Sequence, residues 1–92
     1  MLIKEVVWDE AAELHIWIRH KVGTDEVEEA AFNSRLVIRG KGHAVYEIYG
    51  QTDAGRYLFV VIRLIRGQVA RLITARDMTL TERRRYQRRA VH

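Results

Sequence analysis

The residues that most suggest chemistry lie near the C-terminus, where a cluster of arginines surrounds one tyrosine. The cluster comprises Arg83, Arg84, Arg85, Arg88 and Arg89, with Tyr86 among them. Guanidinium groups neutralise phosphates, and a tyrosine ring can stack on an unpaired base. Like charges four residues apart on a helix repel by a few tenths of a kcal/mol. A sequence that tolerates this repulsion indicates a surface for an anion, RNA in particular. The alternative is a solvated basic helix whose last cations favour the helix dipole.

Arg76 stands at the end of a β-rich run, just before this basic segment. A guanidinium on such a rigid platform can hold a scissile phosphate in place; the alternative is a structural salt bridge with Asp77 or Glu82. Three further arginines on or beside the preceding strands can share the RNA-binding face with Arg84 and Arg88. They are Arg56, Arg63 and Arg71. Because burying an unpaired charge is costly, Arg63 should either pair with Glu47 or open onto a cleft.

Among the four histidines, His20 is the candidate for acid–base chemistry, because it ends a predicted helix beside Arg19. The alternative is a structural role, which is commoner for a lone histidine. His15 and His20 are five residues apart and so point to different sides of a helix. No metal-ligand spacing, Gly-rich phosphate loop or cysteine is present in the sequence. We therefore expect no metal, no cofactor and no disulfide.

Charge is distributed unevenly along the chain, although the formal net charge of the 92 residues is only +4. Residues 1–32 hold three Lys/Arg against eight acids, a net charge of −5. Residues 66–92 hold eight arginines against two acids, a net charge of +6. This asymmetry favours an anionic partner for the second half of the chain. No apolar run approaches a membrane span and no signal-peptide pattern is present, so we expect a single cytoplasmic domain.

The elements that position these residues begin with a predicted strand over residues 2–8 and a helix over 10–21, capped by Asp9. Apolar positions at helical spacing in this helix are Ala11, Leu14 and Ile18, with Trp17 alongside. Thr24 is predicted to cap a second helix over residues 25–32.

Strand signals dominate the second half of the chain. Predicted strands cover residues 44–51, 56–65 and 68–76, and residues 35–39 are an ambiguous edge strand. Arg66-Gly67 suits a tight hairpin turn. Thr79 and Glu82 form the capping box of a last helix. This order predicts an α+β fold, β-α-α-β-β-β-α, in which the two N-terminal helices cover one face of a small antiparallel sheet.

Two blocks of this sequence resemble the BrnT family of type II toxin–antitoxin toxins. One runs from Trp8-Asp9 through Arg19-His20 to Glu28-Glu29-Ala30, and the other runs from Gly50 through Ala75-Arg76 and the capping box to Tyr86. Where the family often has a lysine and an asparagine on the first helix, this chain has Ala12 and Ile16. The resemblance implies a RelE-like fold, metal-independent cleavage of RNA, and neutralisation by a DNA-binding antitoxin similar to BrnA.

RNA cleavage without a metal needs a base for the 2′-hydroxyl, cations for the phosphorane and an acid for the leaving 5′-oxygen. We assign these roles to His20 as base, Arg76 and Arg83 as cations, and Tyr86 as a stacking or donating group. The alternative function is a non-catalytic module that binds nucleic acid or protein through the same basic face. A homodimer and a toxin–antitoxin hetero-oligomer are both compatible with the sequence.

Overall fold

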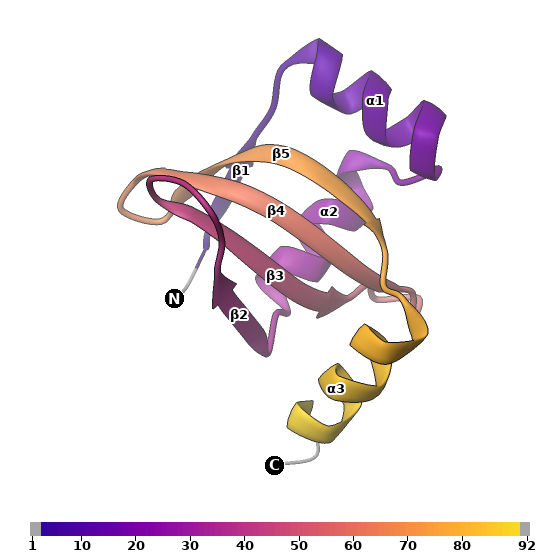
Figure 1. Cartoon of the computed structure of the whole chain (residues 1–92). Helices are drawn as coiled ribbons and strands as arrows, with labels where there is room; N and C mark the ends of the chain where they lie inside the picture. Colours follow the sequence, from indigo (N-terminus) through magenta and orange to yellow (C-terminus); the bar gives the residue numbers. More distant parts are fainter. Residues whose placement is uncertain (1–2, 91–92) are drawn as a thin grey trace.

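The computed structural model describes residues 3–90, which form three helices and five strands (Figure 1). The helices are α1 (Glu10–His20), α2 (Thr24–Phe32) and α3 (Leu80–Ala90). The strands are β1 (Glu5–Val7), β2 (Leu36–Arg39), β3 (Val45–Gln51), β4 (Tyr57–Arg66) and β5 (Val69–Asp77). The α+β class is confirmed, and the ambiguous segment around residues 35–39 is a true edge strand, so four strands follow α2.

The five strands make one sheet in the order β1-β5-β4-β3-β2. The neighbours from β2 to β5 are antiparallel, as predicted, but β1 pairs with β5 in parallel, so the sheet is mixed. Helix α1 lies against β5, and α2 lies over β3 and β4. Figure 1 shows α3 on its own beyond the end of β5, away from the other two helices.

The main hydrophobic core lies between the sheet and the two N-terminal helices. Alternate residues of the central strand point into it, and Leu58, Val60 and Ile62 are fully buried. Helix α2 approaches β3 so closely that a Cβ atom added to Gly50 would stand 2.0 Å from the carbonyl oxygen of Ala30. Glycine at this position therefore lets the helix pack directly on the strand.

The apolar face of α1 that the sequence pattern predicts is exposed rather than buried. Its buried residue is Ile16, whereas the side chains of Leu14, Trp17 and Ile18 are 54%, 53% and 57% exposed. Successive residues of a helix are about 100° apart, so Leu14 and Ile18 stand on the side opposite Ile16. The predicted spacing is helical, but the stripe that it marks faces solvent.

The local signals at helix ends and turns are largely confirmed. Asp9 caps α1 by accepting a hydrogen bond from the Ala12 amide at 2.7 Å. The cap of α2 is Gly23 rather than Thr24, because the Gly23 amide donates to the Glu26 carboxylate at 3.0 Å. The β4–β5 hairpin turns at Gly67 and Gln68, one residue later than predicted, and Gly67 has a positive φ of 46°. Within residues 3–90, no helix is long and apolar enough to cross a membrane.

Candidate nucleic-acid interface

The second face of the sheet carries the arginine-rich helix. Thr79 and Glu82 form the predicted capping box, in which the Thr79 amide donates to Glu82 at 2.8 Å and the Glu82 amide donates to Thr79 Oγ1 at 3.2 Å. Tyr86 then packs with Tyr49 and Phe59 in a small cluster beneath α3. The cap and this cluster together fix the helix against the strands.

Tyr86 is a core residue of this cluster. Its side chain is only 3% exposed, and its ring meets Tyr57 edge-on at 5.9 Å. Burial raises the pKa of its hydroxyl, partly offset by the positive charge of Arg35. Because the residue is almost completely buried, the arrangement gives no support to base stacking on its ring.

Arg76 is held by the helix that follows it. Its Nη1 and Nη2 groups donate to the two carboxylate oxygens of Glu82 at 2.8 and 3.0 Å, and Nη1 also donates to the carbonyl of Asp77. The guanidinium lies 4.2 Å from the centre of the Phe59 ring. These hydrogen bonds lower the pKa of Glu82, and Glu82 in turn raises the pKa of Arg76. Of the two sequence-based alternatives for Arg76, the structure contains the salt bridge with Glu82.

Beside Arg76, a pocket of about 400 Å³ opens between one flank of α3 and the uncovered part of the sheet. It is lined by Ile38, Glu47, Tyr49, Thr81, Glu82, Arg85 and Arg88. We call this pocket the α3 groove. The Arg85 guanidinium lies 5.1 Å from the centre of the Tyr49 ring, and its Nε is buried without a hydrogen-bond partner among residues 3–90. A buried donor without a partner is uncommon, and because Arg85 as a whole is only half-buried, the rest of its side chain lines the groove.

Arg85 belongs to the predicted arginine cluster but was not assigned as an RNA ligand, and Tyr49 was not predicted as a site residue at all. Burial raises the pKa of the Tyr49 hydroxyl, and the nearby charge of Arg85 acts in the opposite direction. The signal for Arg85 was present in the sequence, because positions 81, 85 and 88 share one side of a helix at i, i+4 and i+7. The signal for Tyr49 was absent, since only the sheet register places it beneath this flank.

Arg56 has a structural role at the other side of the sheet. It forms salt bridges with Glu26 at 3.1 Å and Asp77 at 2.7 Å. It also donates to the backbone carbonyls of His20 and Lys21 at 3.1 and 2.8 Å, so it joins the α1–α2 connection to the end of β5. Its predicted role in RNA binding therefore competes with four intramolecular partners.

Arg83 and Asp77 line one shallow pocket at the start of α3. The His20 ring meets the His15 ring edge-on at 5.8 Å, so the prediction that these two histidines point to different sides of the helix is wrong. The positive charge of His20 contributes to lowering the pKa of Asp77, after the larger effect of its hydrogen bond with Arg56. Arg83 lies 4.1 Å from the centre of the Tyr57 ring and lines a shallow pocket of about 280 Å³ that also includes Asp77. We call this group the Asp77 cluster; the first turn of α3 separates it from the α3 groove.

The remaining predicted RNA ligands are spread apart. Arg63 and Arg71 are exposed and face each other across the β4–β5 register, near the hairpin end of the strands. Arg63 donates to the backbone carbonyl of His43 rather than pairing with Glu47. Arg88 lines the α3 groove, and Arg84 is exposed on the helix. Within residues 3–90, no group of three or more His, Cys, Asp or Glu could hold a metal ion.

The sequence itself matches no known family model and no curated protein. The structure is similar to the crystal structure of the Brucella abortus ribonuclease toxin BrnT, with a TM-score of 0.68 and 17% sequence identity, over 82% of this chain and 96% of that one. The chain has the fold of a BrnT toxin. At 17% identity the likeness to BrnT concerns the fold, and the roles of the side chains rest on the arrangement described above.

Proposed function

We propose that this BrnT-like chain is the toxin of a type II toxin–antitoxin pair, an endoribonuclease that cleaves RNA without a metal. The observation that carries the proposal is the α3 groove, where the half-buried Arg85 lies over Tyr49 on a fold shared with a ribonuclease toxin. Arg88 lines the same groove, and the Glu82 carboxylate there is already paired with Arg76. Such a surface fits the phosphates of a single-stranded RNA.

In the proposed reaction, the 2′-oxygen attacks the adjacent phosphorus as its proton passes to His20. The P–O5′ bond breaks, the 5′-oxygen takes a proton, and a 2′,3′-cyclic phosphate remains. Arg83, in the same cluster as His20, stabilises the charge of the phosphorane, and the protonated His20 supplies the proton to the 5′-oxygen. Arg76 acts on the neighbouring phosphate across the first turn of α3, and Tyr86, buried beneath α3, positions that helix. Because the Asp77 cluster and the α3 groove lie on opposite sides of the first turn of α3, the RNA must pass over that turn to contact both.

The test is to incubate the purified chain with total RNA in EDTA and to map the cleavage ends. We expect defined cleavage that His20→Gln and Arg83→Gln each reduce by about 10²-fold or more. Arg66→Gln, an exposed arginine next to the hairpin turn, serves as the matched charge control and should retain cleavage. Cleavage that persists in both His20→Gln and Arg83→Gln would remove the Asp77 cluster from the reaction.

A non-catalytic binding module is the second candidate function. It is favoured by α1, where two positions that often carry a lysine and an asparagine in the BrnT family are occupied by Ala12 and the buried Ile16. These side chains have no group that could take part in proton transfer. RNA binding through the α3 groove without any cleavage in EDTA would support this function over the nuclease.

We further propose that a cognate antitoxin covers the basic face with an acidic or amphipathic segment. Charge reversal at Arg83 and Arg84 should then weaken both RNA binding and antitoxin binding. Antitoxin affinity that responds neither to this reversal nor to salt would show that the antitoxin binds a different face.

A further inference from the structure

The exposed stripe on α1 is unlike the rest of the molecular surface. Leu14, Trp17 and Ile18 lie three and four residues apart, so they form one continuous apolar strip, and each is more than half exposed. Isolated apolar residues are normal on a protein surface, but a contiguous strip marks an interaction site. Its helical spacing is that of a buried face, yet within residues 3–90 the strip stays exposed, and the Lys21 ammonium lies 5.8 Å from the centre of the Trp17 ring.

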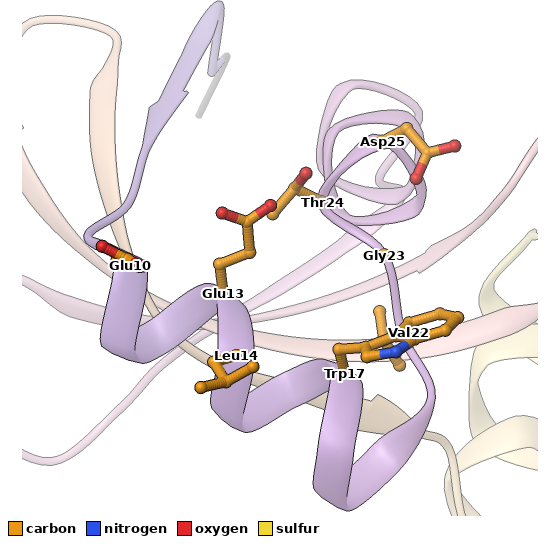
Figure 2. Close-up of a pocket in the computed structure, with 8 residues that line it drawn as sticks. All are labelled: Glu10, Glu13, Leu14, Trp17, Val22, Gly23, Thr24 and Asp25. Carbon is orange, nitrogen blue, oxygen red and sulfur yellow. The ribbon is translucent and has the colours of Figure 1, made fainter.

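The strip borders a hollow between α1 and the beginning of α2 (Figure 2). The hollow has a volume of about 470 Å³ and is lined by Glu10, Glu13, Leu14, Trp17, Val22, Gly23, Thr24 and Asp25. We call it the α1–α2 groove. Its floor includes the fully buried Val22, and Figure 2 shows the Trp17 ring beside Val22. The strip and the groove together provide the concave apolar surface that an amphipathic helix needs.

The rim of the α1–α2 groove is acidic. Glu10 and Glu13 project from α1, and Asp25 stands at the start of α2 (Figure 2). None of these three carboxylates forms a salt bridge within residues 3–90. They belong to the segment of residues 1–32 that carries a net charge of −5. A ligand for this groove must therefore combine apolar side chains with positive charge.

RNA, a membrane surface and the chain's own helix α3 do not fit this groove. RNA and an anionic lipid surface would be repelled by the acidic rim. The chain's own basic helix is also a poor ligand, because the only large apolar side chain that α3 exposes within residues 3–90 is Leu80.

We propose that the α1–α2 groove is a docking site for a basic amphipathic helix of another protein. Apolar residues of that helix at i, i+3 or i+4, and i+7 cover Leu14, Trp17 and Ile18, while flanking Lys or Arg side chains pair with Glu10, Glu13 and Asp25. This site is distinct from the α3 groove in charge and position. A protein could therefore occupy it while RNA is bound to the opposite basic face.

The proposal can be tested with a display library of 16-residue helical peptides that carries apolar residues at this spacing and randomised flanking positions. The library is selected on the full chain and counter-selected on a Glu10→Lys/Glu13→Lys variant. We expect enrichment of peptides rich in Lys and Arg. Synthetic copies should bind the unmodified chain at least about tenfold more tightly than this variant, which corresponds to about 1.4 kcal/mol. Leu14→Asp should also abolish binding.

Glu5→Lys, an exposed acid on β1 outside the groove, is the charge control and should retain peptide binding. Circular dichroism and RNA binding should be unchanged in all variants, since none of these residues lies in the α3 groove or the Asp77 cluster. The proposal is overturned if no peptide is enriched, or if the enriched peptides bind the Glu10→Lys/Glu13→Lys variant equally well. Sedimentation that shows a dimer disrupted by Leu14→Asp would assign the groove to a second copy instead.

Discussion

The arginines of this chain differ chiefly in what already binds them. Arg56 donates hydrogen bonds to two carboxylates and two backbone carbonyls, and these bonds join separate elements of the fold. Arg76 is partly engaged, because Glu82 and the Asp77 carbonyl take three of its five N–H donors. Arg85 forms no salt bridge within residues 3–90, and it lines the α3 groove. Availability for a phosphate should therefore increase from Arg56 through Arg76 to Arg85.

Replacing Arg76 tests whether its role is structural, catalytic or both. Arg76→Ala removes a two-pronged, partly buried ion pair, and we expect the free energy of unfolding to fall by about 1–2 kcal/mol. If the guanidinium also acts on a phosphate of the RNA, RNA cleavage should fall by about 10²–10³-fold. Urea denaturation and the cleavage assay measure the two effects separately.

Glu82→Gln is the matched variant, because it breaks the ion pair but keeps Arg76 and an oxygen that can accept from the Thr79 amide. It should lose stability and keep cleavage. Cleavage retained in Arg76→Ala together with the stability loss would leave Arg76 as an ion-pair partner only.

Two carboxylates predict how stability depends on pH. Hydrogen bonds from Arg76 and Arg56 lower the pKa of Glu82 and Asp77, respectively, below their ordinary values of 4.5 and 3.8. A lowered pKa in the folded state means that the stabilisation is fully present above these ordinary values and is lost as the pH falls through the folded ones. Urea denaturation should show a free energy of unfolding that decreases below about pH 4.5, with a shallower decrease in Glu82→Gln. An identical pH profile in this variant would contradict the assignment.

At the scale of elements, the first turn of α3 determines where the arginines of the candidate interface lie. Its capping box orients Glu82 toward both the Thr79 amide and Arg76, so one carboxylate closes the helix end and anchors the last strand. The position of Arg83 and Arg85 on opposite flanks follows from where this turn begins.

Thr79→Ala should cost about 1 kcal/mol of unfolding free energy, because it removes the acceptor for the Glu82 amide. Thr81→Ala, two residues later, is the control, since the amide of Glu82 is bonded to the hydroxyl of Thr79 and not to that of Thr81. Thermal or urea denaturation of both variants measures the difference. Equal stability of the two variants would show that the cap contributes nothing.

Helices, strands and turns that are encoded by neighbouring residues could be predicted from the sequence. The strand pairings and helix packing that join distant segments could not. The Thr79–Glu82 box, the glycine turn before β5 and the apolar run of β4 are written in adjacent residues. The parallel pairing of β1 with β5 joins segments more than sixty residues apart. Periodicity also located the stripe on α1 without revealing that no other element covers it.

The candidate site shows the same division between local and distant information. The salt bridge of Arg76 with Glu82, six residues away, was among the sequence-based alternatives. The partners of Arg56, which are 30 and 21 residues distant, were beyond any local pattern. Tyr49 enters the α3 groove only through the register of the sheet.

At the scale of the whole molecule, opposite charges occupy different parts of the fold. The acidic segment of residues 1–32 forms β1 and the two helices on one face, and the arginine-rich helix α3 lies on the other face. The positive electrostatic potential of the α3 face attracts a polyanion such as RNA, and the negative potential of the opposite face repels it. The two proposed ligands can therefore be separated experimentally by their response to salt and to charge reversal.

RNA binding should weaken steeply with salt, because each phosphate neutralised by an arginine releases a condensed counterion. For a single strand, the slope of log K against log salt concentration changes by about 0.7 for each contact. Arg85→Gln and Arg88→Gln, both in the α3 groove, should each reduce the slope by about this amount, and the double variant by about twice as much. Arg66→Gln beside the hairpin turn should leave the slope unchanged. Filter binding or fluorescence anisotropy of a labelled single-stranded RNA at several salt concentrations measures these slopes, and equal slopes in all variants would place the phosphates on another face.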